Sequence, residues 1–263
     1  MEFFRLLSFS LENYGQALRL LGRKRMWLWL LYPLFLNLFI FGAGIWAVAE
    51  VTDVTLNYLQ DLFGFDTWAS QDNFFQTILY WILWFVFKVI YFILFAFLSG
   101  NIILILMSPA LALLSEQTEK LLTGTDYPFI FSRFLRETVR GIGLALRNML
   151  FQFALMAVLF ILGFIPFVGA LVPIALLLVS SYFYGFSYLD YYHERRQVKI
   201  SESVRFMRQN KGLAVGNGLP FALLLLIPLF GSLIASFFSV ITVIAGTYSM
   251  HSRYQQGNPS NIR

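Results

Sequence analysis

The chain has 263 residues, of which 59% are hydrophobic and 13% are charged, whereas a soluble domain carries about 25% charged residues. Its 30 phenylalanines are too many to bury in one water-soluble core, so the composition indicates an integral membrane protein. The net charge of +5 does not indicate nucleic-acid binding, because the basic residues lie at the ends of apolar segments, where they meet lipid phosphates. The absence of cysteine excludes disulfides and thiolate metal sites.

The first helix is predicted over residues 3–25, with an amphipathic pattern that ends in a basic cluster. The first span follows as 23 uncharged residues, Trp27–Ala49, long enough to cross a bilayer. The basic cluster offers cationic donors beside a helix start, which could bind an oxyanion. The alternative is an anchor on lipid phosphates. Its residues are Gly22, Arg23, Lys24 and Arg25.

One polar segment, residues 50–73, differs from all the others because it contains acids but no Lys or Arg. Cytoplasmic loops are enriched in Lys and Arg. We therefore expect this segment outside and every other polar segment on the cytoplasmic side. Its acids are Glu50, Asp53, Asp61, Asp66 and Asp72.

The second apolar run, Phe74–Met107, has 34 residues and would be about 51 Å long as one helix. This exceeds the ~30 Å hydrocarbon core, so the run tilts, bends near residues 99–101 or projects from the bilayer. Ser108-Pro109 then predicts a helix restart, with Ser as N-cap and Pro at the first position. Lys88 is the only charge inside a span, and Asn37 lies at a similar depth. The two could pair or flank a pore, or Lys88 could snorkel or make a structural hydrogen bond.

A separate interfacial helix is predicted over residues 129–148, with four arginines along one stripe. This arginine stripe could line a basic vestibule that concentrates anions, or it could lie on lipid headgroups. Its members are Arg133, Arg136, Arg140 and Arg147.

Two long uncharged runs follow, Met149–Leu189 and Leu213–Met250, each interrupted by a Pro-x-x-Gly motif. The motifs, FIPFVGALV and LIPLFGSLI, lie 62 residues apart in matching contexts, which suggests a parallel repeat. The arms before the prolines measure about 21–22 Å, which favours re-entrant hairpins. Six full spans are the alternative, because each run is long enough for two. The tip residues are Pro166, Gly169, Pro228 and Gly231.

Catalytic and metal chemistry find little support in the sequence. Asp190, His193 and Glu194 have a metal-like spacing, but helix capping and pairing with Arg195 or Arg196 explain them better. No nucleophile triad or phosphate-binding loop occurs. We expect no enzyme activity, no cofactor and no metal.

The order of motifs is specific. After the basic N-terminal helix come two long helices, Ser-Pro at 108–109, LLSEQTE at 113–119, the arginine-rich helix, FIPFVG at 164–169, YLDY at 188–191, a basic helix at 199–211 and IPLF at 227–230. Over residues 10–253 this resembles the CysZ family of bacterial sulfate permeases, which includes the eukaryotic etoposide-induced membrane protein. The family's Gly with an adjacent Arg pair is similar to Gly22-Arg23-Lys24-Arg25, although the basic residues here lie about three positions further from Pro33.

The resemblance implies an all-α membrane protein with two long transmembrane helices, two partly penetrating hairpins and amphipathic interfacial helices. It also implies homo-oligomers and sulfate entry across the inner membrane for cysteine synthesis. We expect one domain over 1–253, a loose tail over 254–263, and sulfate or a related oxyanion and anionic lipids as partners. A non-transporting scaffold or tether is the alternative, because the eukaryotic branch shows that the fold need not mean sulfate transport.

Overall fold

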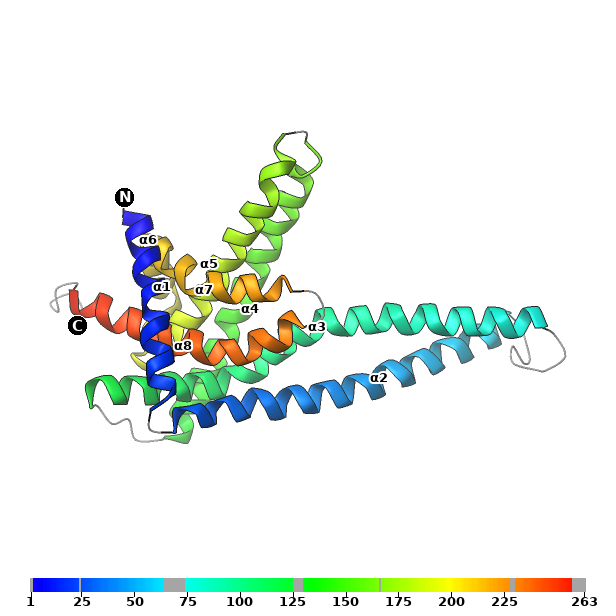
Figure 1. Cartoon of the computed structure of the whole chain (residues 1–263), viewed down its shortest axis with the longest axis horizontal. Helices are drawn as coiled ribbons and strands as arrows, with labels where there is room; N and C mark the ends of the chain where they lie inside the picture. The colour runs from blue at the N-terminus through cyan, green and yellow to red at the C-terminus, as the bar shows by residue number, and fades with distance from the viewer. Residues whose placement is uncertain are drawn as a thin grey trace. The chain divides into compact units, whose positions relative to one another are not determined.

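The computed structural model describes residues 2–23, 25–63, 74–124, 130–165, 167–227 and 230–256. Regular structure in these ranges is entirely helical, which confirms the predicted all-α class (Figure 1). The helices are α1 (Glu2–Leu21), α2 (Leu31–Phe63), α3 (Phe74–Thr123), α4 (Phe131–Leu162), α5 (Val172–Arg195), α6 (Ile200–Gln209), α7 (Lys211–Leu225) and α8 (Gly231–Gln256), with the short 3-10 helices η1 (Met26–Leu30) and η2 (Gly169–Leu171).

Four stretches in the described part are long and apolar enough to cross a bilayer: Met26–Leu59, Leu135–Leu162, Gly169–Arg195 and Gly231–Gln255. Large apolar side chains on them face outward, including Phe39 and Trp46 on α2 and Phe160 on α4. Such continuous exposed apolar surface is stable only against lipid. The predicted membrane protein with several spans is therefore confirmed.

The chain divides into two compact units, one formed by Met1–Pro33 with Leu104–Arg263 and the other by Leu34–Ile103. In the second unit α2 and α3 lie side by side and antiparallel (Figure 1). A 2.8 Å hydrogen bond between the hydroxyls of Thr55 and Tyr91 joins them and sets their register.

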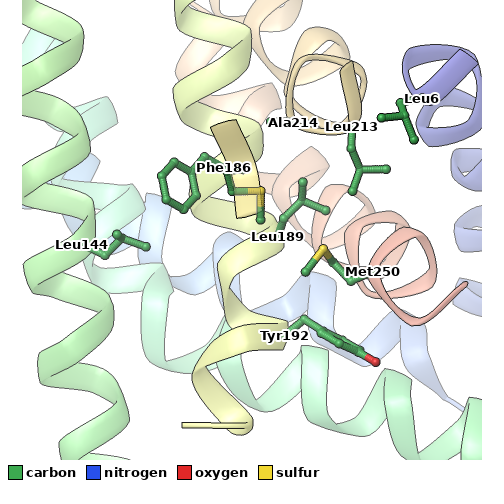
Figure 2. Packing of buried hydrophobic residues seen from close by; sticks show 9 residues of the cluster. Leu6, Leu144, Phe186, Leu189, Tyr192, Leu213, Ala214 and Met250 are labelled. Carbon is green, nitrogen blue, oxygen red and sulfur yellow. The ribbon is translucent and has the colours of Figure 1, made fainter. Parts of the chain in front are cut away.

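The first unit has a core to which six of its helices contribute (Figure 2). Burying these side chains stabilises the unit by roughly 25 cal/mol per Å² of apolar surface removed from solvent. The core residues are Leu6, Leu144, Phe186, Leu189, Tyr192, Met207, Leu213, Ala214 and Met250, which come from α1, α4, α5, α6, α7 and α8.

Helix α7 packs against its neighbours through glycines. A Cβ at Gly185 of α5 would lie 1.8 Å from the carbonyl oxygen of Ala214, and one at Gly218 would lie 1.9 Å from that of Ser181. On another side of α7, a Cβ at Gly212 would lie 2.1 Å from the carbonyl oxygen of Phe3 on α1. Small residues let membrane helices approach backbone to backbone. Helix α7 is thus held between α1 and α5 by backbone contact.

The predicted helix restart at Ser108-Pro109 is wrong. Helix α3 is continuous for 50 residues, with Pro109 in its interior. A proline inside a helix costs about 3 kcal/mol. Met107, Leu111 and Leu114 around it are almost fully buried, and their burial offsets that cost because it requires an unbroken helix.

The prediction of a separate interfacial helix over residues 129–148 is also wrong. Residues 131–162 form the single helix α4, which contains both the arginine stripe and the first hairpin arm. This arm is therefore longer than the short arm assumed for a re-entrant hairpin, whereas α7 has only 15 residues. Nothing in the sequence between Arg147 and Met149 stops a helix. Hairpin depth stays a prediction.

Candidate functional site

Charged side chains converge where α3, α4, α5, α6 and α8 meet in the first unit. We call this set the base network, because it lies at the opposite end of α4 and α5 from their connecting turn. Its members are Ser115, Glu119, Arg140, Asp190, His193, Arg195, Arg196, Ser203 and Tyr254.

Glu119 near the end of α3 accepts from two consecutive arginines at the end of α5. The Nε of Arg195 donates to Oε2 over 2.9 Å, and Arg196 donates to both carboxylate oxygens. The Nη1 of Arg195 also donates to the Ser115 hydroxyl over 2.6 Å. Glu119 and Arg195 are almost fully buried, whereas Arg196 is partly exposed and stacks on Tyr192. The carboxylate therefore fastens the end of α5 to α3.

Asp190, one turn earlier on α5, is the second centre of the network. The Nη1 of Arg140 donates to its Oδ2 over 2.6 Å, and Nη2 of the same arginine donates to the carbonyl of Val198 over 2.9 Å. The Ser203 hydroxyl of α6 donates to Oδ1. These bonds tie α4 and α6 to α5.

His193 extends this centre to α8. Its Nδ1 lies 2.9 Å from the Ser203 hydroxyl, and its Nε2 lies 2.6 Å from the Tyr254 hydroxyl. Ser203 donates its only proton to Asp190, so it accepts from Nδ1–H. Nε2 then accepts from Tyr254. Each of these side chains is buried or bonded to another residue of the set. The serine–histidine–aspartate set therefore has a structural role and holds helices together.

We expect acid to weaken the first centre. Burial alone would raise the pKa of Glu119, but hydrogen bonds from Arg196 and the charges of Arg195 and Arg196 hold it below the ordinary value of 4.5. A lowered folded-state pKa contributes stability above the unfolded value, and this is lost as pH falls through the folded one. The apparent melting temperature in detergent should therefore fall below about pH 4.5. Glu119→Gln should flatten this part of the pH profile, and an unchanged profile would contradict it.

The predicted anion-binding cluster lies in the turn between α1 and η1. Gly22, Arg23 and Arg25 are exposed, and Arg25 has a left-handed φ of 60°; Lys24 lies outside the described residues. Two nearby amides are already used, since Met26 N–H donates to the carbonyl of Arg23 and Leu28 N–H to that of Arg25. Any anion here would thus rely mainly on side chains.

The arginine stripe does not act as one surface. Arg140 turns inward to Asp190 with a side chain 15% exposed, whereas Arg136 is exposed. Arg147 donates to Asn148 over 3.0 Å and stacks on Phe151. The side chain of Arg133 lies outside the described part. One member is therefore used for internal packing.

Asn37 and Lys88 do not pair. The register set by Thr55 and Tyr91 places Lys88 level with about residue 58 of α2, roughly 30 Å along the axis from Asn37. The similar depth expected from the sequence assumed that α2 ends near residue 49, but it continues to Phe63. Lys88 instead lies over the ring of Trp84, with Nζ 3.8 Å from the centroid, a contact that partly offsets its desolvation.

Of the predicted hairpin-tip residues, the structure describes the two glycines. Gly169 begins η2, and Gly231 begins α8; Pro166 and Pro228 lie outside the described residues. In the part of the chain that the structure describes, no three His, Asp or Glu side chains gather as metal ligands. The expected pairing of Asp190 with Arg195 or Arg196 is wrong, because Asp190 bonds Arg140 and both other arginines bond Glu119.

These features define a multi-span helical membrane protein in which buried ion pairs fasten the base of the α4–α5 hairpin. Residues 13–236 match the family described as sulfate transporter CysZ/etoposide-induced protein 2.4, and the chain belongs to this family. Curated relatives from Pseudomonas paraeruginosa and from two strains of Pseudomonas aeruginosa are each described as "Sulfate transporter CysZ". Each is 25% identical over 224 residues, covering 83% of this chain and 86% of the relative. The family is one of transporters.

Sequence reasoning missed Glu119, Ser203 and Tyr254 as parts of one network. A signal existed for Glu119, because the polar stretch 115–120 at the end of α3 contains an acid for which the sequence suggests no partner. Its partners lie 76 and 77 residues away, and no local pattern identifies them. Tyr254 had been expected in a loose tail, yet α8 continues to Gln256 and brings its hydroxyl to His193.

Proposed function

We propose that the protein admits sulfate or a closely related oxyanion across the bacterial inner membrane, as a permease or channel that supplies sulfur for cysteine synthesis. The observation that carries this proposal is the family match over residues 13–236, together with relatives described as sulfate transporters. The base network is consistent with this transport proposal. A transporter requires no reactive side chain, and the network exposes no such side chain to solvent.

The chemistry would be electrostatic. Conduction needs groups that replace part of an anion's hydration yet release it again. Arg23 and Arg25 are exposed in the turn after α1, and guanidinium groups bind oxyanions through paired N–H donors. No ATP-binding motif occurs in the sequence, so we propose movement down an electrochemical gradient or coupled to ions.

The proposal includes an orientation and an assembly. Residues 50–73 would lie outside, with the basic segments, the base network and both hairpin bases on the cytoplasmic side. Anionic lipids would contact the basic segments. Copies of the chain would assemble as a homo-oligomer, as the family resemblance implies.

The test of function is uptake of radiolabelled sulfate into liposomes that contain the purified protein. We expect uptake above protein-free liposomes, and competition by chemically similar oxyanions more than by chloride. No flux, together with no sulfate binding, would contradict the proposal and favour the scaffold alternative.

The basic cluster can be tested by replacing Arg23, Lys24 and Arg25 with Gln. Removing three positive charges should weaken sulfate binding by roughly tenfold or more, about 1.4 kcal/mol per factor of ten, with melting and oligomer size unchanged. Isothermal titration in detergent would measure the affinity. Arg133 and Arg136 to Gln is the control and should change it little. Unchanged affinity in the triple variant would assign the cluster to lipid anchoring.

A further inference from the structure

Glu194 of α5 is a buried acid that the base network does not use. It is only 3% exposed, almost as little as Asp190 and Glu119. Those two acids accept hydrogen bonds from arginines. Glu194, in contrast, makes no hydrogen bond or ion pair with any residue in the described ranges. An ionised carboxylate that is buried without a donor is strongly unfavourable.

The carboxyl group of Glu194 lies against α4 at Gly141. A Cβ at Gly141 would be 3.3 Å from each of the two carboxyl oxygens of Glu194. Glycine leaves room for the carboxyl group at this point, but it supplies no side-chain donor. The contact with α4 therefore accommodates the group without stabilising a negative charge on it.

The charged residues around Glu194 are engaged with other partners. Arg140 bonds Asp190, and Arg195 bonds Glu119 of α3. Asp190 lies one turn before Glu194 on the same face of α5, and a carboxylate at that position opposes a second negative charge. The titratable and charged groups that face Glu194 are Glu137 and Arg140 from α4 and Asp190, Tyr191 and Arg195 from α5.

One donor beside this carboxyl group is unused. The guanidinium of Arg140 donates through Nη1 to Asp190 over 2.6 Å and through Nη2 to the carbonyl of Val198 over 2.9 Å. These two acceptors lie four residues before and four residues after Glu194. The Nε of Arg140 is buried and has no hydrogen-bond partner. An ionised Glu194 would be attracted to this Nε–H and would compete with Asp190 for one guanidinium, which would loosen α4 from α5.

We propose that Glu194 is a proton-binding site between α4 and α5, that it carries its proton in the folded protein, and that loss of this proton loosens the base of the hairpin. The only bond that changes is the carboxyl O–H, whose proton passes to solvent and leaves a carboxylate. This inference stands independently of sulfate transport, because it concerns how two helices are held together.

The first test is infrared spectroscopy of the purified full chain in detergent. At neutral pH the parent should show the C=O stretch of a protonated carboxylic acid, and this band should disappear as the pH is raised. E194Q should lack the band, whereas the matched control E12Q, which removes an exposed acid of α1, should retain it. Exposed glutamates ionise near pH 4.3, and arginines hold the other two buried acids of the described part ionised. Absence of the band from the parent at neutral pH would overturn the proposal, whether or not E194Q folds.

The second test is thermal melting as a function of pH. The unfolded chain loses the proton of residue 194 near pH 4.3, whereas the folded chain keeps it to higher pH. The folded state then binds more protons, so stability falls as the pH rises through this range. E194Q should flatten this decline and E12Q should keep it. An unchanged decline in E194Q would contradict the proposal.

The loosening of the hairpin base can be measured directly, because the chain has no native cysteine. Spin labels on V139C of α4 and Q197C after α5 occupy exposed positions. Their distance, measured by double electron–electron resonance, should increase over the pH range in which the infrared band disappears, and should stay constant when E194Q is added. A constant distance in the parent would show that loss of the proton does not loosen the hairpin.

Discussion

Gly185→Ala and Gly218→Ala are expected to separate α5 from α7 and to unfold the first unit at much lower temperature. The added Cβ atoms would lie 1.8 and 1.9 Å from backbone carbonyl oxygens, so no side-chain rotation relieves the clash. Overpacking of a core costs 1–3 kcal/mol and occasionally more, and we expect at least about 3 kcal/mol here because backbone must move. Thermal unfolding in detergent, followed by circular dichroism, would measure the loss.

The matched control for these variants is Gly143→Ala. Gly143 lies on α4, and a Cβ there meets nothing within 4 Å. Alanine also has the higher helix propensity, by about 1 kcal/mol, so this variant should melt at or slightly above the parent. Parent-like melting of Gly185→Ala would show that α5 and α7 do not pack backbone to backbone.

The second large effect is expected from Glu119→Ala. Its removal leaves the buried guanidinium of Arg195 without its carboxylate, and breaking a buried ion pair by removing one partner costs about 3–5 kcal/mol. Glu12→Ala removes an exposed acid of α1 and should cost little. Thermal unfolding of both variants in the same detergent would compare them.

A double variant separates the ion pair from general packing. Glu119→Leu combined with Arg195→Met removes both buried charges. Of the three charged residues in this centre, only the partly exposed Arg196 then remains. Apolar replacement of a whole buried pair is often neutral, so the double variant should recover more than half of the loss. If the two single losses simply add, Glu119 and Arg195 do not interact energetically.

The glycine variants and Glu119→Ala are both expected to lose folding stability because they disturb the packing of the hairpin helices. This packing bears on function. Tight glycine packing and the base network together fix α5, α6, α7 and α8 at the end where charged residues collect. Under the proposed function, variants in this packing should lower sulfate uptake through loss of folded protein, whereas variants of the turn after α1 should lower sulfate affinity with folding intact.

The sequence by itself determined the class of the protein and its helical composition. Long uncharged runs have only a few stable solutions in lipid, since every backbone polar group must be satisfied within the segment. The Pro-x-x-Gly motifs predict both turns, but the left-handed φ of 67° in the first turn belongs to Phe167 and not to glycine. The glycines instead allow close backbone approach, because a Cβ at Gly169 would lie 2.4 Å from the carbonyl oxygen of Gly163, and one at Gly231 would lie 2.6 Å from that of Leu224. The order of motifs also identified the family, which the match over residues 13–236 confirmed.

Only the tertiary structure decided where helices continue and which charges meet. Local signals at Ser108-Pro109 predicted a break, but burial of Met107, Leu111 and Leu114 keeps α3 whole. The four arginines looked equivalent on a helical wheel, yet Arg140 turns to Asp190, 50 residues away, while Arg147 faces Phe151. Spacing along a chain fixes which side chains share a helix face, whereas the partner of that face depends on how helices pack, because buried charges stabilise the fold only where long-range contacts neutralise them.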